Sequence, residues 1–323
     1  MVGSVIVYND TIIGEGWHKK AGEPHAEVNA VRSVKDKSLL KKATIYVSLE
    51  PCSHFGKTPP CCDLIIENKI PNVVVGTVDP NEKVAGNGIR KLVEAGANVV
   101  VGILEDECNE LNKRFFTFHQ KKRPYIILKW AESLDGYLAP EKETNQERRP
   151  VWITNTFSRQ LVHKWRSEEQ AILVGTQTVI DDNPKLNVRD WSGNNPVRVV
   201  LDQNNRISKD SFVFDGSVKT IIFTKSDNTI STENILFEKI EFNKNTIENI
   251  LSVLYQHQIQ SIIIEGGKQT LQSFIDKNIW DEARVFIGKN TFEKGTKAPE
   301  LKKKNEAKTY IQNDELIYIR NHD

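Results

Sequence analysis

The stretch that decides the fold of the first half reads HAE at residues 25–27 and EPCSHFGKTPPC at residues 50–61. His25, Cys52 and Cys61 form a ligand set typical of Zn²⁺, and three protein ligands leave the fourth tetrahedral position to water. Such an open site is catalytic in design, because zinc lowers the pKa of bound water from about 15.7 toward roughly 7. Glu27 lies two residues beyond His25, so we expect it to carry the proton of that water to a leaving group.

The order H-x-E followed by P-C is the signature of zinc deaminases that act on nucleobases. In the general motif the second cysteine follows the first by three residues, whereas Cys61 follows Cys52 by nine. The alternative is a structural zinc or a pair of buried thiols, but a structural site would need a fourth protein ligand. We expect Cys62 and Cys108 to be packing residues.

Composition limits the remaining possibilities. A length of 323 residues predicts about two domains. The 44 Lys and Arg against 43 Asp and Glu leave a formal charge of +1, so no global field favours nucleic acid or a membrane surface. Four cysteines in such a chain form no disulfide framework. The N-terminus lacks a basic leader and a cleavage site. We therefore expect a cytoplasmic protein with no membrane partner.

The first third of the chain alternates apolar, β-rich runs with helical patterns. Asn9-Asp10, between the first two runs, is a hairpin signal. Helices between unbroken apolar strands predict an α/β sheet covered on both faces. The expected strands are residues 2–8, 11–17, 44–48, 72–77 and 98–101, and the expected helices are 24–34, 61–68 and 88–94.

A basic segment, HQKKRP at residues 119–124, breaks this pattern and is typical of a linker. We therefore expect one domain at residues 1–120 and a second α/β domain at 124–323. The charged runs 139–149 and 302–308 predict solvated loops. In the second domain we expect strands at 125–130, 171–175, 197–201, 220–224, 261–265 and 284–288, and helices at 156–166, 246–257 and 269–277.

Three features of the second half point to a reductase. The turn SLDG at residues 133–136 follows an expected strand. In EGG at 265–267, between a strand and a helix, the glycines let backbone N–H groups approach a phosphate; a simple tight turn is the alternative. Arg166 and Arg189 flank DDNP at 181–184, and arginine forks suit a substrate phosphate.

Together these strings resemble the bifunctional deaminase/reductase family of riboflavin biosynthesis, over essentially the whole chain. In that family eight residues separate the two cysteines, as they do here. The strings WH at 17–18, GEP at 22–24, DPN at 79–81 and VAGNG at 84–88 also match. The resemblance implies two α/β domains: an N-terminal, cytidine-deaminase-like, three-layer α/β/α domain and a C-terminal, dihydrofolate-reductase-like domain.

For the first domain, the resemblance implies that His25, Cys52 and Cys61 hold zinc and that Glu27 shuttles protons. The implied reaction is hydrolytic loss of the 2-amino group from 2,5-diamino-6-ribosylamino-4(3H)-pyrimidinone 5′-phosphate. His54 contacts either the substrate or its own loop.

For the second domain, the resemblance implies that NADPH supplies a hydride that reduces the ribosyl group of the deaminated product to a ribityl chain. It also implies a small-molecule substrate and a homo-oligomer, a dimer or a tetramer. The implied NADPH contacts are Ala131, Trp152, Thr178, Asp182, Gly267, Lys268, Gln269, Thr270, Leu271, Gln272 and Ser273. The implied substrate contacts are Arg166, Leu186, Arg189 and Glu265.

The sequence departs from the family pattern in three places. The family carries a helix and a P-N-P segment before the position of Val2-Gly3, so we expect a truncated chain; the alternative is a reductase with an impaired deaminase half. Pro150 stands where the family often has a substrate-binding serine, and the loop before Trp152 is longer than usual.

Two rival functions explain less of the sequence. A nucleic-acid-binding module with a structural zinc is disfavoured by the near-zero charge and by the lack of an aromatic and basic stripe. A deaminase of tRNA or free nucleosides leaves the second half unexplained.

Overall fold

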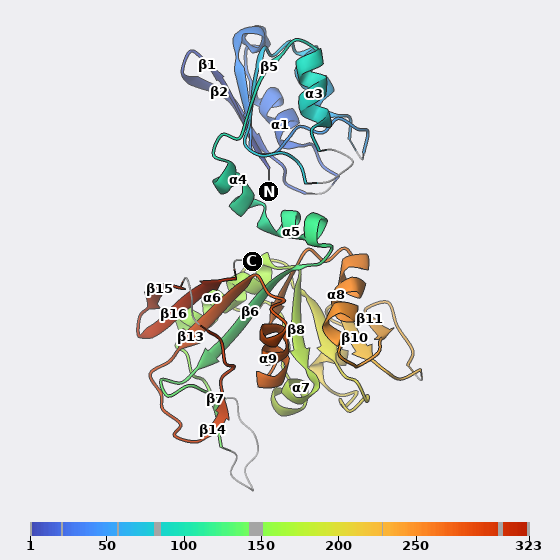
Figure 1. Ribbon diagram of the computed structural model, residues 1–323, viewed down its shortest axis with the longest axis vertical. Coiled ribbons are helices and arrows are strands. Elements are labelled where there is room, and N and C mark those ends of the chain that lie inside the picture. The colour runs from blue at the N-terminus through green and yellow to red at the C-terminus, as the bar shows by residue number, and fades with distance from the viewer. Residues whose placement is uncertain are drawn as a thin grey trace. The chain divides into compact units, whose positions relative to one another are not determined.

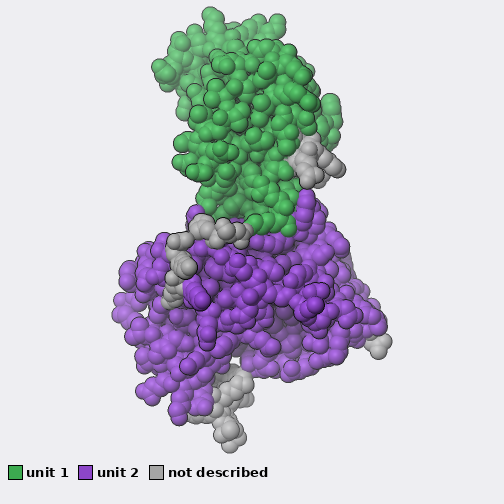
Figure 2. Space-filling view, viewed as in Figure 1, with its two compact units in different colours: residues 1–121 green, residues 122–323 purple. Residues whose placement is uncertain are grey.

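The computed structural model describes residues 2–20, 22–56, 58–80, 85–141, 151–227, 229–302 and 306–321. The chain divides into two compact units, residues 1–121 and 122–323, which are coloured separately in Figure 2. Each unit has its own sheet and its own buried core.

Unit 1 is built on a five-stranded sheet in the order β2-β1-β3-β4-β5 (Figure 1). The first three strands pair antiparallel, and β3, β4 and β5 run parallel. The strands are β1 (Gly3–Tyr8), β2 (Thr11–Trp17), β3 (Thr44–Val47), β4 (Asn72–Val75) and β5 (Asn98–Val101). The helices are α1 (Ala26–Ser33), the 3₁₀ helix η1 (Lys37–Lys42), α2 (Cys61–Glu67), α3 (Asn87–Glu94), α4 (Glu105–Leu111) and α5 (Lys113–Lys121).

The hairpin signal between β1 and β2 is confirmed. Asn9 and Asp10 both have positive φ, 47° and 55°, which is the conformation of a type I′ turn. This turn places β1 in the middle of the antiparallel part of the sheet.

Helices α1, α2 and α3 cover one face of this sheet. Buried residues from all three helices, such as Val31, Ile65 and Leu92, pack against Ile45 and Val73 of the strands. Helix α4 lies on the other face, where Cys108 contacts Gly76 just after β4. That face keeps a cavity of about 440 Å³ beside exposed aromatic side chains of β2 and β3.

Unit 2 is built on a nine-stranded sheet in the order β11-β10-β9-β8-β12-β6-β13-β16-β15 (Figure 1). Every neighbouring pair is parallel except β13 with β16 and β15 with β16. The strands are β6 (Tyr125–Glu132), β8 (Ala171–Gly175), β9 (Val197–Leu201), β10 (Thr220–Thr224), β11 (Ile235–Lys239), β12 (Ser261–Ile264), β13 (Glu282–Ile287), β15 (Glu306–Ile311) and β16 (Asp314–Arg320). A separate pair joins β7 (Tyr137–Pro140) to β14 (Gly295–Lys297).

Helices cover both faces of the large sheet. Helices α8 (Thr246–Gln256) and α9 (Lys268–Asp276) pack on one face through residues such as Ile250 and Phe274. Helices α6 (Thr156–Glu168) and α7 (Thr176–Asp182) pack on the other face through Trp165 and Val179. A short 3₁₀ helix, η2 (Phe212–Phe214), precedes β10. The carboxyl ends of the parallel strands thus meet at one edge, where open α/β sheets bind ligands.

Two sequence expectations about loops need correction. The run 302–308 was expected to be a loop, but Glu306–Ile311 forms the edge strand β15. All but one of its side chains are exposed, so it carries no hydrophobic alternation that predicts a strand. In the run 139–149, Ala139 and Pro140 end β7, and residues 142–150 lie outside the described residues.

Helices α4, α5 and α7 were not expected from the sequence, because their short patterns show no long apolar periodicity. Among the described residues, no helix is both long and apolar enough to cross a bilayer.

Candidate active sites

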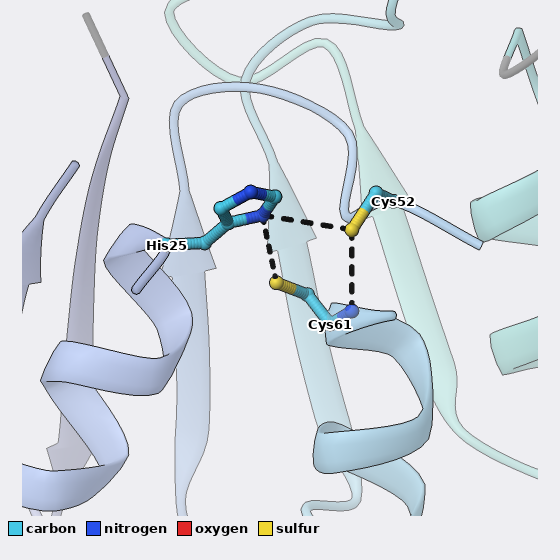
Figure 3. A group of neighbouring side chains, drawn as sticks. All are labelled: His25, Cys52 and Cys61. Carbon is cyan, nitrogen blue, oxygen red and sulfur yellow. Dashed lines mark hydrogen bonds between the residues drawn. The ribbon is translucent and has the colours of Figure 1, made fainter. Parts of the chain in front are cut away.

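Three side chains from three separate segments meet in unit 1 (Figure 3). His25 is the residue at which α1 begins, Cys52 lies in the loop after β3, and Cys61 is the first residue of α2. The Nδ1 atom of His25 is 3.6 Å from Sγ of Cys52 and 3.3 Å from Sγ of Cys61. All three ligand atoms lie within 4.8 Å of one another.

This geometry fits a tetrahedral zinc ion. Ligand atoms about 2.0–2.3 Å from one tetrahedral ion lie roughly 3.4–3.8 Å from one another. The His25–Cys52 separation of 3.6 Å falls in this range, and the His25–Cys61 separation of 3.3 Å lies just below it. In the protein without an ion, a hydrogen bond from the Cys61 thiol lowers the pKa of Cys52 to about 4. The same hydrogen bond, together with burial, raises the pKa of Cys61. Zinc binds cysteine as the thiolate, so metal binding at this group would release protons.

The remaining ring nitrogen of His25 is also oriented. Its Nε2 atom is 3.3 Å from the hydroxyl of Thr58, which lies in the same loop as Cys52. The His18 ring stands edge-on to the His25 ring, with centroids 5.1 Å apart. Partners of this kind fix the orientation of a metal-binding imidazole.

Glu27 lies in the first turn of α1, and it is 3 % exposed. Burial raises the pKa of Glu27. A buried carboxyl group with a raised pKa holds a proton more readily than an exposed one, which suits a group that passes a proton on in general acid–base catalysis.

The other thiols of the chain do not join this group of three. Cys62 is buried in the core of unit 1 and donates its thiol hydrogen to the carbonyl oxygen of Pro51, at 3.2 Å. Cys108 borders the cavity on the opposite face of the sheet. His54 is exposed in the loop between Cys52 and Cys61.

In unit 2, glycines at the edge of the sheet create a cradle. A Cβ atom on Gly266 would stand 2.4 Å from the Cα atom of Val174, and one on Gly175 would stand 2.8 Å from the Thr270 hydroxyl. Gly267, at which α9 begins, has a φ of +29°. The backbone after β12 therefore packs directly against the end of β8. Helix α9 begins at this point without a side-chain cap, and a helix N-terminus of this kind suits a phosphate.

Seven of the residues expected to contact NADPH, 267–273, lie at the start of α9, and three of their side chains are occupied. Leu271 is buried in the core, and the Ser273 hydroxyl bonds to the backbone of Gln269. The side-chain amide of Gln272 donates hydrogen bonds to the Asp276 carboxylate and to the backbone carbonyl oxygen of Glu300.

The other expected cofactor contacts are spread over three elements. Ala131 lies near the end of β6, and Thr178 and Asp182 lie on α7. Trp152 is 55 % exposed, and the guanidinium of Arg159 lies 4.3 Å from its ring centroid. Pro150 lies outside the described residues.

Next to the cradle, Arg166 and Glu265 form a two-pronged ion pair, with N–O distances of 3.2 and 2.8 Å. Burial alone would raise the pKa of Glu265, but the charges of Arg166 and Lys129 lower it to about 2. Burial lowers the pKa of Lys129 on β6. Arg189 faces the same group, and burial and Arg166 lower its pKa. The three cations Lys129, Arg166 and Arg189 outnumber the two carboxylates Glu265 and Asp190 that face them, which favours an anionic ligand.

Three residues of this cluster were missed by the sequence analysis. Lys129 is a single charged residue within the otherwise apolar first part of β6, so its pattern indicates only a buried strand. His163 on α6 accepts the backbone N–H of Arg189 through Nδ1 at 3.4 Å. Among the described residues, the buried Oδ1 atom of Asn187 has no hydrogen-bond partner. The signal that could have found Asn187 is its position between Leu186 and Arg189, two expected substrate contacts.

A second feature was also missed. A cavity of about 560 Å³ lies where β9 and β10 end, and it is lined by Gln203, Asn204, Asn205, Lys225, Ser226 and Asp227. Thr176 follows Gly175 at the end of β8 and donates its hydroxyl hydrogen to the backbone carbonyl oxygen of Leu201 at the end of β9. This bond connects the strand end beside the cavity with the strand end beside the cradle.

Comparison with known proteins matches both units. Residues 1–77 match the family model of the cytidine and deoxycytidylate deaminase zinc-binding region. Residues 124–292, more than half of the chain, match the RibD C-terminal domain. The chain belongs to the RibD family.

Full-length relatives agree with this assignment. The riboflavin biosynthesis protein RibD of Aquifex aeolicus is 41 % identical over 308 residues, which cover 93 % of this chain and 83 % of the relative. RibD of Escherichia coli is 36 % identical over 303 residues, covering 88 % and 80 %. RibD proteins are bifunctional enzymes of riboflavin biosynthesis, a deaminase and a reductase in one chain.

A solved structure confirms the fold class. The diaminohydroxyphosphoribosylaminopyrimidine deaminase/5-amino-6-(5-phosphoribosylamino)uracil reductase of Thermotoga maritima superimposes with a TM-score of 0.88 at 37 % identity. The match covers 99 % of this chain and 92 % of that one. The expected two-domain α/β architecture, a cytidine-deaminase-like domain followed by a dihydrofolate-reductase-like domain, is therefore confirmed.

Proposed function

We propose that this RibD chain performs two consecutive reactions on one phosphoribosylaminopyrimidine. Unit 1 would remove the 2-amino group of the diaminopyrimidine by hydrolysis, and unit 2 would then reduce the ribosyl group of the resulting uracil to ribityl. The observation that carries the first step is the group of His25, Cys52 and Cys61 beside the buried Glu27. The family match to a zinc-binding deaminase region supports the same reading.

In unit 1, His25 Nδ1 and the two cysteine sulfurs would hold zinc, which when bound supplies Lewis-acid activation of water. Glu27 would take a proton from the attacking water and deliver it to the departing amino group, which leaves as ammonia. The oxygen of the water then occupies C2 of the pyrimidine. Thr58 would keep the His25 ring in the orientation seen in Figure 3.

In unit 2, the N-terminus of α9 at Gly267 suits the pyrophosphate of NADPH, because no side chain caps this helix and the first N–H groups of a helix attract anions. Gly266 lets the backbone before α9 pack against β8, where a Cβ atom would stand 2.4 Å from the Cα atom of Val174. NADPH, when bound, supplies a hydride. The cavity at the ends of β9 and β10 would take the adenosine end of the cofactor.

The substrate would bind beside the Arg166–Glu265 pair. The cations Lys129, Arg166 and Arg189 outnumber the carboxylates of Glu265 and Asp190, so this cluster suits a phosphate monoester. Leu186 is buried, so it would contact substrate through its backbone.

We further propose that the protein acts in the cytoplasm as a homo-oligomer, with no nucleic-acid or membrane partner. All four cysteines are free thiols, which is typical of a reducing compartment. The near-zero formal charge gives no general attraction for polyanions.

Glu27→Gln tests the proposal. The variant should release no measurable ammonia from the diaminopyrimidine, because its amide cannot accept the proton of water. It should still oxidise NADPH when the deaminated product is supplied. Ammonia release at the wild-type rate by Glu27→Gln would overturn the assignment of the deaminase.

A further inference from the structure

One buried carboxylate near the zinc ligands has no part in the chemistry described above. Glu50 follows β3, lies two residues before Cys52 and is 4 % exposed. Its Oε1 atom accepts the backbone N–H groups of Gly88 at 2.8 Å and Ile89 at 3.2 Å. Its Oε2 atom accepts those of Gly86 at 3.0 Å and Asp79 at 3.2 Å.

These four bonds make Glu50 the cap of a helix that is distant in sequence. Helix α3 begins after Gly86, which has a φ of 72° and no side chain with which to cap the helix. The first N–H groups of a helix need an acceptor, and a negative charge there also interacts favourably with the helix dipole. The carboxylate of Glu50 meets both needs from another segment.

The same junction includes the backbone on both sides of the zinc site. A Cβ atom on Gly88 would stand 2.0 Å from the carbonyl oxygen of Pro51, so α3 begins directly against the residue before Cys52. That carbonyl oxygen also accepts the thiol hydrogen of Cys62 at 3.2 Å. Cys62 follows the ligand Cys61 on α2. Glu50 therefore fixes the start of α3 against Pro51, and Pro51 in turn is hydrogen-bonded to α2, so both sulfur ligands lie next to this junction.

We propose that Glu50 is a positioning residue for the zinc site: by capping α3 it fixes the Pro51-Cys52 backbone and hence the distance between the two thiolates. This inference rests on the proposed zinc-dependent deaminase. It adds a residue that sets metal affinity and geometry without touching the ion or the substrate.

Glu50→Gln is the test, because glutamine keeps the size of the side chain but replaces one carboxylate oxygen with an NH₂ group. That group cannot accept the two backbone N–H hydrogen bonds which the oxygen accepts, and its own hydrogens would face those donors. We expect the zinc dissociation constant, measured by competition with a chromogenic chelator, to rise about 10–100-fold, as for other residues that support metal ligands. The thiolate-to-metal charge-transfer band of the Co²⁺-loaded protein should also change. Glu50→Asp, which keeps the charge but is shorter, should show a smaller loss.

The matched control is Glu94→Gln at the other end of α3, where the side chain is exposed and pairs with Arg90. Its zinc affinity and Co²⁺ spectrum should equal those of the wild type. Reductase activity of each variant shows whether unit 2 is folded. If Glu50→Gln does not fold, the zinc affinity and the Co²⁺ spectrum of Glu50→Asp provide the test instead. Wild-type zinc affinity and an unchanged Co²⁺ spectrum would overturn the role of Glu50. A wild-type protein that binds no zinc would instead overturn the proposed deaminase.

Discussion

At the scale of single residues, the zinc ligands and their supporting groups differ in how visible they are in the sequence. His25, Cys52 and Cys61 could be named from residue type and spacing, because few side chains bind zinc. The choice of Nδ1 as the ligand atom and the contact with Thr58 could not. Glu50 stands in the quoted motif, but its role was missed because its hydrogen-bond partners lie 29–39 residues further along the chain. Lys129 and His163 were missed because their partners also lie far away in sequence.

His163 gives the first prediction at this scale. Burial, followed by the charges of Arg166 and Arg189, lowers the pKa of His163 to about 4, so the ring is neutral at pH 7. Its Nδ1 atom accepts the N–H of Arg189, and Nε2 lies 3.3 Å from Asp190. His163→Leu removes both contacts. At about 1 kcal/mol for each lost hydrogen bond, we expect the reductase KM for its pyrimidine substrate to rise roughly five- to thirty-fold.

His163→Gln is the control, because an amide can both accept and donate as the neutral ring does. Steady-state NADPH oxidation at pH 7 should give a KM near that of the wild type for Gln, with kcat little changed in either variant. Equal KM values for His163→Leu and the wild type would contradict this role.

Glu265 gives a prediction about pH. Its pKa is lowered to about 2 in the folded protein, so the carboxylate stabilises the fold above its ordinary pKa of about 4.5, and this contribution is lost as the pH falls toward 2. Urea unfolding of the wild type and Glu265→Gln should show a stability difference that is constant from pH 5 to 8 and shrinks below about pH 4.5. A difference that stays constant down to about pH 2.5 would show that the Arg166–Glu265 ion pair does not stabilise the fold.

At the scale of elements, buried strands were predictable and exposed or short elements were not. The strands 171–175, 197–201 and 220–224 have the bounds expected from their continuous apolar runs. The edge strand β15 and the short helix α7 carry no such pattern, since one is exposed along its length and the other has seven residues. Tertiary pairing, rather than local sequence, defines these elements.

The glycine cradle gives a prediction at this scale. A methyl group on Gly266 would push against the backbone of Val174, which cannot yield without moving β8. We expect Gly266→Ala to destabilise unit 2 by about 1–3 kcal/mol and to raise the KM for NADPH. Thermal unfolding and NADPH titration measure the two effects. Gly3→Ala, where a Cβ atom would meet nothing within 4 Å, should leave both unchanged.

At the scale of the whole molecule, the two sites lie in different compact units with separate cores. Removing zinc with a chelator should therefore abolish ammonia release while leaving NADPH oxidation with the deaminated substrate within about twofold of its untreated rate. Readdition of Zn²⁺ should restore ammonia release. If chelation stopped both reactions equally, zinc would have a role beyond unit 1.

The most direct test of the account is to follow both reactions on one preparation of the zinc-loaded chain. Given the diaminopyrimidine phosphate and NADPH, the protein should release ammonia first and then oxidise NADPH in an equal final amount. Without NADPH, ammonia release should continue and the deaminated uracil should accumulate. Substrate-dependent NADPH oxidation without any ammonia release would contradict the assignment of two linked reactions to this chain.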